Sequence, residues 1–259
     1  PLDWKFFLLI SMIVPVYSLI IKLKNNEKLF EKVKLTKSNI FILVVLIMFL
    51  ITLFMYHKGA FSYEHLENDD PWQHALGTKY VSIEKVAETP GFATDFFAYL
   101  DPYPPGYDGL MGILHQTSPS LSWTLKFFNA LIISLGIIFF YFFAKLFMGN
   151  RKKALLATFF LAAIPCYASH FIWVHGLIPT LFIVSMYCLE KIKADKKWVY
   201  PAILVIAGIC FTHMLQPIKL GILFLLYLIG KSIIEKRFAK WEFVSIFSGY
   251  LLSFLWWGF

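Results

Sequence analysis

Two adjacent carboxylates, Asp69 and Asp70, stand directly before Pro71 and are well suited to chemistry. Paired acids can bind a divalent cation, or one of them can act as a general base toward an attacking group. Acidic side chains also favour the positive N-terminal end of a helix, and proline is tolerated in its first turn. The pair therefore has two interpretations. One is a catalytic or metal-binding site, and the other is a helix start in which Asp69 is the cap and Asp70 a solvated acid.

Histidine and lysine side chains add a second set of candidates further along the chain. His170 and His175 occupy one short link between apolar segments, and His213 occupies the next such link, six residues before Lys219. Neutral imidazole binds divalent metals, so His175 is a candidate metal ligand together with Asp70, with simple hydrogen bonding as the alternative. A lysine beside such a link suits a phosphate group, and we assign His213 and Lys219 to substrate binding.

The elements that position these residues are membrane helices. Apolar residues make up 59% of the chain and charged residues 15%, and the mean hydropathy is +0.67, which is typical of polytopic membrane proteins. Almost continuous apolar runs exclude the alternating pattern of a membrane β-barrel. We expect an all-α fold, a single transmembrane domain over 1–259, with about eight spans near 4–21, 39–57, 122–147, 153–172, 175–190, 198–214, 217–235 and 241–259.

Charge placement predicts the sidedness of this integral membrane protein. Four basic clusters alternate along the helix order: Lys22, Lys24, Lys28, Lys32, Lys34 and Lys37; Lys145, Arg151, Lys152 and Lys153; Lys191, Lys193, Lys196 and Lys197; and Lys231, Lys236, Arg237 and Lys240. The positive-inside rule places all four in the cytoplasm. The net charge of +8 thus reflects topology and not a nucleic-acid partner.

The same rule places the long segment 58–121 and the links near His175 and Gln216 on the extracytoplasmic side. Segment 58–121 is acidic, with Glu64, Glu67, Asp69, Asp70, Glu84, Glu88, Asp95, Asp101 and Asp108. A loop of this length is usually functional or contains its own secondary structure, and we expect short amphipathic helices in it. One should begin at Asp69 to Pro71, carry Trp72, Ala75, Leu76, Tyr80 and Ile83 on an apolar face at the membrane surface, and end by Pro90.

Motifs in this loop resemble a known family. Asp70-Pro71-Trp72 followed by Thr78-Lys79-Tyr80 resembles the first outer loop of the catalytic subunit of oligosaccharyltransferases, and the segment Tyr103 to Tyr107 resembles the Tyr-Pro-rich end of that loop. More loosely, the chain is similar to the GT-C class of membrane glycosyltransferases. The resemblance implies that Asp70, with Asp69, is catalytic and that the donor is a sugar on a polyprenyl phosphate or pyrophosphate. His74, Tyr103, Tyr107 and Asp108 are assigned to substrate binding, and the acceptor is a protein, lipid or glycan.

Departures from the family pattern define what else the sequence predicts. Leu76 stands where the family usually has Arg, and the second outer link has histidines where the family has acidic metal ligands. We therefore predict a divalent ion, Mg²⁺ or Mn²⁺, held by Asp70 and His175, as a cofactor. The family's C-terminal soluble domain does not follow, so the chain is either a fragment of a longer enzyme, which we favour, or a reduced relative.

Two other functions remain open at this stage. A carrier or binder of lipid-linked glycans would use the same polar groups without chemistry, but no paired broken helices or internal repeat favour it. An inactive scaffold would explain Leu76 and His175. The three cysteines, Cys166, Cys188 and Cys210, fall in separate apolar runs and are expected to be buried and inert.

Overall fold

Long apolar runs make the chain helical throughout the part that the structure describes. The computed structural model describes residues 2–26, 37–89, 99–100, 103–164 and 171–257, and this part contains helices and no strand. The α-helices are α1 Trp4–Lys24, α2 Lys37–Ala60, α3 Asp69–Glu84, α4 Gly106–His115, α5 Leu121–Met148, α6 Arg151–Ala163, α7 Leu177–Lys191, α8 Val199–Thr212, α9 Gln216–Glu235 and α10 Lys240–Trp257. Two short 3₁₀ helices, η1 Val174–Gly176 and η2 Lys196–Trp198, precede α7 and α8. The all-α prediction is confirmed.

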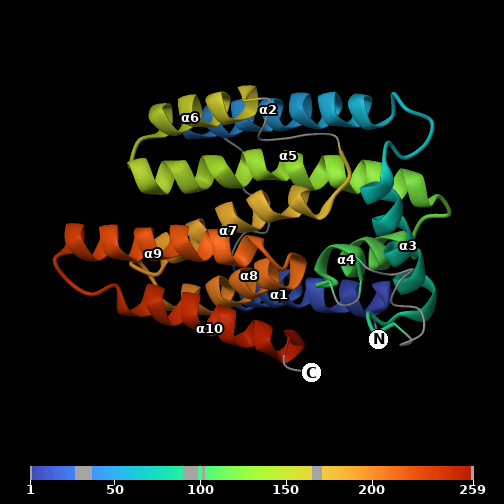
Figure 1. The fold of residues 1–259 in the computed structure, drawn as a ribbon. Helices are drawn as coiled ribbons and strands as arrows, with labels where there is room; N and C mark the ends of the chain where they lie inside the picture. Colours follow the sequence, from blue (N-terminus) through green and yellow to red (C-terminus); the bar gives the residue numbers. More distant parts are fainter. Residues whose placement is uncertain (1, 27–36, 90–98, 101–102, 165–170, 258–259) are drawn as a thin grey trace.

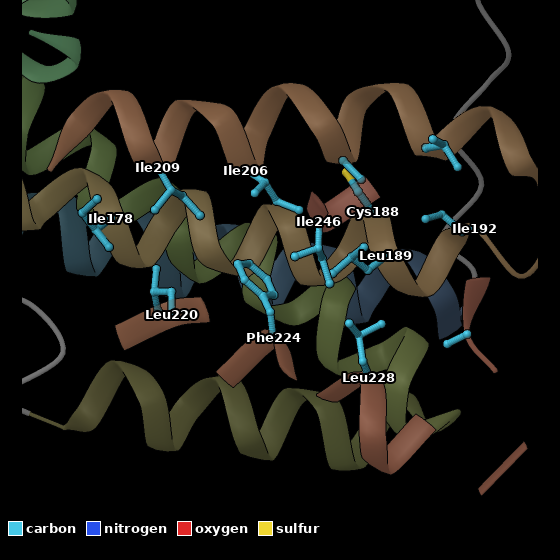
Figure 2. Packing of buried hydrophobic residues seen from close by; sticks show 13 residues of the cluster. Ile178, Cys188, Leu189, Ile192, Ile206, Ile209, Leu220, Phe224, Leu228 and Ile246 are labelled. Atoms are coloured by element: carbon cyan, nitrogen blue, oxygen red, sulfur yellow. The ribbon is translucent and has the colours of Figure 1, made fainter. Parts of the chain in front are cut away.

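The long helices run side by side, and α3 and α4 lie together at one end of them (Figure 1). Buried side chains of α7, α8, α9 and α10 form the largest apolar core, in which Ile206 and Phe224 are almost inaccessible (Figure 2). A smaller core joins α2, α5 and α6 through Val45, Tyr141 and Ala154. A third core, around Tyr107 and Met111, fixes α3 and α4 against α5 and the residues before α7.

Each of the eight predicted apolar runs contains a helix, but the structure supports a smaller number of spans. Among the described residues, four helices are long and apolar enough to cross a membrane: α1, Asn39–Ala60 within α2, α5 and α9. Helices α6, α7 and α8 have 13, 15 and 14 residues, fewer than the roughly 20 that a hydrocarbon core requires. The protein is therefore described as having four candidate membrane helices, and the count of eight is not confirmed.

Exposed apolar side chains cover the outside of these helices. Phe54 on α2 is 67% exposed and Ile234 on α9 is 82% exposed, and similar residues continue along both helices. A soluble protein rarely exposes contiguous apolar surface of this extent. The pattern fits helices whose outer faces contact lipid.

The segment between α2 and α5 contains two helices, as predicted, and most of the predicted apolar face of α3 lies on the side away from the protein interior. Ala75 is buried, whereas Trp72, Leu76 and Ile83 are exposed. The buried positions are Pro71, His74, Ala75, Gly77, Thr78 and Val81, which pack toward α4. Small and polar side chains allow α3 and α4 to approach closely, and hydropathy alone does not reveal this. The helix ends at Glu84, before Pro90 as predicted, because Lys85 adopts a left-handed conformation with φ 59°.

A buried ionic cluster joins three helices at the other end of the molecule. The Lys231 ammonium on α9 lies 2.8 Å from Glu242 on α10, 3.6 Å from Glu190 on α7 and 3.0 Å from the Tyr227 hydroxyl. The Tyr227 hydroxyl in turn donates to Glu190 at 2.7 Å. The cation therefore has carboxylate partners inside the bundle, as burial of a charge requires.

Candidate functional site

The Asp70 carboxylate is held by a hydroxyl group at the start of α3. The helix is capped by Asn68, whose side chain accepts from the Asp70 backbone N–H at 3.3 Å, so Asp69 is not the cap. Asp70 is half-buried and its Oδ1 accepts a hydrogen bond from the Tyr99 hydroxyl, whereas Asp69 is exposed. The bond to Asp70 raises the pKa of Tyr99 to about 12, so the phenol stays protonated at neutral pH and continues to donate.

His74 and Asp108 form a buried pair between α3 and α4. His74 Nδ1 lies 2.7 Å from Asp108 Oδ1, and the side chains are 2% and 1% exposed. His74 Nε2 faces the backbone N–H of Val174 at 3.4 Å. Since that N–H can only donate, Nε2 is the accepting nitrogen and Nδ1 carries the hydrogen that is donated to Asp108. The pair thus connects α3, α4 and the link before α7.

Close packing of the two helices isolates one oxygen of Asp108. Burial raises the pKa of Asp108 and His74 opposes this shift. The second oxygen, Oδ2, is buried and has no hydrogen-bond partner among the residues that the structure describes. It lies against the Cα of Gly77, where a methyl group would overlap it. Gly112 of α4 is packed equally closely against Val81 of α3, so glycines on both helices permit this approach.

A continuous row of rings runs from Asp70 to the start of α9. Tyr99 packs on Tyr103 with ring centroids 5.6 Å apart, and Tyr103 packs on His213 at 5.4 Å. His213 lies 4.5 Å from His175, which in turn lies 4.3 Å from Trp173. Residues from segments far apart in the sequence are thereby brought to one end of the molecule.

His213 connects the end of α8 to the start of α9. Its Nδ1 accepts from the backbone N–H groups of Leu215 at 3.0 Å and Gln216 at 3.3 Å, so in the neutral ring Nε2 carries the hydrogen. Burial, followed by the charges of His175 and Lys219, lowers the pKa of His213 to about 4. The ring is therefore neutral at physiological pH.

The pKa of His175 is shifted in opposite directions by a carboxylate and an ammonium group. Burial and the Lys219 ammonium lower the pKa of His175, while the Asp70 carboxylate acts in the opposite direction. Its Nδ1 is buried and lacks a hydrogen-bond partner within the described part of the chain. Lys219 itself is exposed in the first turn of α9. The row of rings thus places Asp70, His175 and His213 in one region, beside the helix start that carries Lys219, and their common function stays a prediction.

Tyr107 lies in the interior of the protein beside His74. It is 1% exposed, and its hydroxyl donates to Asn129 Oδ1 on α5 at 3.3 Å. The Asn129 amide donates to the carbonyl of Phe171 at 3.0 Å. The Tyr107 ring also packs on the His74 ring, with centroids 4.9 Å apart. The role of Tyr107 in substrate binding stays a prediction, because these contacts are all internal.

The donor set gives limited support to a metal ion. Within the described residues, no three His, Cys, Asp or Glu side chains are grouped so that they could hold one. Asp70 and His175 supply at most one carboxylate and one imidazole, whereas Mg²⁺ prefers six oxygen ligands, several of them often water. The predicted residues therefore do not by themselves fit a magnesium site.

Two residues of the site were missed by sequence reasoning. Tyr99 bonds to Asp70, and the regular four-residue spacing of Tyr99, Tyr103 and Tyr107 could have drawn attention to it. Asn129 lies in an apolar run and gave no comparable signal. Of the earlier candidates, Asp95, Asp101, Cys166 and His170 lie outside the described residues, while Cys188 and Cys210 are free and buried as expected.

Comparisons with other proteins give no further assignment. No family model, no curated protein and no solved structure matches this chain.

Proposed function

We propose that this protein is a membrane glycosyltransferase of the GT-C type. It moves a sugar or oligosaccharide from a polyprenyl phosphate or pyrophosphate donor to an acceptor, a protein, lipid or glycan, on the extracytoplasmic face. The observation that carries the proposal is geometric: Tyr99, which donates to Asp70, begins the row of rings that reaches His213 and His175 next to the start of α9, where Lys219 lies. Glycosyl transfer from a phosphate needs both a base for the acceptor and a cation for the leaving group.

The leaving phosphate would bind at the start of α9. Lys219 supplies a positive charge there, and the helix N-terminus adds the favourable end of its dipole. His213 Nε2 carries a hydrogen and Nδ1 is already occupied by backbone donors, so Nε2–H is the group that would donate to a phosphate oxygen. Exposed apolar surface on α9, including Ile218 and Ile222, would accommodate the lipid chain of the donor.

The acceptor would be activated at Asp70. Tyr99 occupies Oδ1, so Oδ2 is the oxygen that would take the proton of the attacking group. His74 and Asp108 hold the Tyr99 side of the site, since the His74 ring packs on Tyr99 with centroids 4.9 Å apart. A single displacement of this kind inverts the configuration at the anomeric carbon.

The decisive experiment uses the protein in lipid nanodiscs with radiolabelled sugars on polyprenyl phosphate and pyrophosphate. Release of the lipid phosphate and transfer to candidate acceptors are measured for the wild type, Asp70→Asn and Asp69→Asn. Loss of a general base should slow transfer by about a hundredfold or more in Asp70→Asn. Asp69 is the second acid that the family resemblance implies to be catalytic, but it is exposed, whereas Asp70 accepts from Tyr99. We therefore expect Asp69→Asn to retain the wild-type rate, and the same assay tests the predicted catalytic role of Asp69.

Three results separate the competing functions. Equal transfer by both variants would remove Asp70 from the chemistry. Tight donor binding with no transfer by the wild type would favour a binder or carrier of lipid-linked glycans. A divalent ion, Mg²⁺ or Mn²⁺, remains a proposed cofactor, and full activity in the presence of a chelator would exclude it.

A further inference from the structure

A cavity of about 350 Å³ opens at the end of the molecule far from Asp70. It lies between the link that joins α7 to η2 and the connection between α9 and α10, which turns at the left of Figure 1. Ile192, Ala239 and Glu242 are its buried members. Glu242 is already paired with the buried Lys231 at 2.8 Å, so the floor of the cavity carries no free negative charge.

Four cations line the walls of this cavity: Lys193, Lys196, Arg237 and Lys240. Lys193 and Arg237 share one carboxylate, Glu235, at 3.2 and 2.9 Å. Lys196 and Lys240 have no carboxylate within salt-bridge distance among the described residues. Their ammonium groups lie instead 5.1 and 5.7 Å from the centroid of the Trp241 ring, which is also part of the wall. The cavity therefore presents excess positive charge over an aromatic face.

The surroundings of the cavity indicate what kind of anion it takes. Phe238, which lines it, is 64% exposed, and Ile233 and Ile234 of the preceding helix are 70% and 82% exposed. An aromatic ring, lysines and exposed apolar side chains together are typical of the membrane interface, where basic groups meet lipid phosphates. A soluble anion would gain nothing from the apolar rim, whereas the acyl chains of a lipid would cover it.

We propose that this cavity binds the phosphate headgroup of an anionic membrane lipid. Lys196 and Lys240 contact the phosphate, Trp241 forms the wall beneath their ammonium groups, and the acyl chains lie along Phe238 and the exposed face of α9. This site is independent of the transfer chemistry proposed at Asp70, and it would bind a lipid that is not consumed.

The test uses the full chain in detergent, titrated with phosphatidic acid and analysed by native mass spectrometry. The wild type should retain one phosphatidic acid molecule and discriminate against phosphatidylcholine. In the Lys196→Gln/Lys240→Gln variant binding should weaken roughly thirtyfold, since each lysine near a lipid phosphate contributes about one kcal/mol. The control, Lys152→Gln/Lys153→Gln, removes two exposed charges from the start of α6, at the same end of the molecule but outside the cavity, and should bind as the wild type does.

Three results would overturn the proposal. An equal loss in both double variants would show that only general surface charge attracts the lipid. Unchanged binding by the Lys196→Gln/Lys240→Gln variant would place the lipid elsewhere. Equally tight binding of glycerol 3-phosphate, with the same dependence on Lys196 and Lys240, would show that the cavity takes a soluble phosphate and that the apolar rim is irrelevant.

Discussion

Asp70 has a fixed position because Tyr99 donates to one of its oxygens. The adjacent Asp69 is exposed, so two identical side chains at consecutive positions differ in how tightly their orientation is controlled. Orientation matters for a base, because displacement by about one ångström can cost roughly a hundredfold in rate. At the scale of single residues, the hydrogen bond from Tyr99 is therefore expected to affect turnover and not donor binding.

Replacing Tyr99 by phenylalanine tests this role directly. We expect Tyr99→Phe to lower kcat by roughly tenfold, with little change in KM for the donor, because the carboxylate remains but loses its anchor. Tyr80→Phe is the matched control. Tyr80 lies on α3, the helix that carries Asp70, but its hydroxyl donates to the carbonyl of Glu88 at 2.8 Å. Steady-state kinetics on both variants distinguishes the two cases, and equal rates would contradict the positioning role.

His213 should make the folded state sensitive to acid. Its pKa is lowered to about 4 in the fold and is near 6.5 in an unfolded chain, so the unfolded state binds the proton first. The stability that depends on neutral His213 is thus present above about pH 6.5 and falls as the pH drops toward 4. Thermal unfolding midpoints between pH 8 and 4.5 should fall less steeply in His213→Asn, whose carbonyl can replace Nδ1 as acceptor. Parallel curves would contradict the assignment.

At the scale of elements, α3 and α4 pack closely because glycines stand where they meet. Glycines at 77 and 112 let the helices approach until His74 reaches Asp108, so the acidic end of α3 and the ring row are assembled by one close contact. This contact has little apolar surface on α3, where the buried residues include His74 and Thr78. Its stability therefore depends on shape and on satisfied polar groups more than on hydrophobic area.

A methyl group at position 77 should separate these helices. Gly77→Ala would overlap Asp108 Oδ2, and overpacking of this kind typically costs 1–3 kcal/mol. The unfolding midpoint and the transfer rate should both fall. Gly230→Ala is the control, because a Cβ there meets nothing within 4 Å, and its midpoint should stay unchanged or rise slightly. A neutral Gly77→Ala would show that α3 and α4 are packed less tightly than described.

Helix positions followed from the sequence, whereas the contacts between helices did not. The helix that contains Phe224 could be located from its apolar run, because hydropathy is read from residues that are adjacent in the sequence. The pairing of His74 with Asp108 joins residues 34 positions apart and depends on Gly77, so no local pattern reveals it. The burial of Ala75 was likewise not predictable, since a helical row of apolar residues does not state which of its members face protein and which face lipid.

At the scale of the whole molecule, charge is divided between the two ends. The turns α5–α6 and α9–α10, both rich in Lys and Arg, lie at one end, and the acidic α3 lies at the other (Figure 1). If the positive-inside rule holds, the end with Asp70 is extracytoplasmic. The candidate site and the proposed lipid cavity would then face opposite leaflets of the same bilayer.

Cysteine labelling tests this arrangement. Thr117→Cys, in the turn before α5, should react with a membrane-impermeant maleimide added to intact cells. Lys197→Cys, in η2 before α8, should react only after permeabilisation; both positions are exposed in the structure. Both variants are made in a Cys166→Ser background, and the remaining native Cys188 and Cys210 are buried and should contribute little labelling. Labelling of Lys197→Cys from outside would reverse the orientation and place the Asp70 site in the cytoplasm.

Helix α1 is held to the rest of the protein by hydrogen bonds at its N-terminal end. None of its residues is buried. At its N-terminal end the Leu2 N–H donates to the Lys85 carbonyl, the Trp4 N–H donates to the Gln116 side-chain oxygen, and the Gln116 amide donates to the Leu2 carbonyl. With 21 residues the helix is about 30 Å long, so a tilt of about 10° moves its far end by roughly 5 Å. The tilt of α1 relative to the membrane would then be set by the thickness of the surrounding bilayer more than by protein contacts. Membranes of different thickness would hold α1 at different inclinations while Asp70 and its neighbours stay in place.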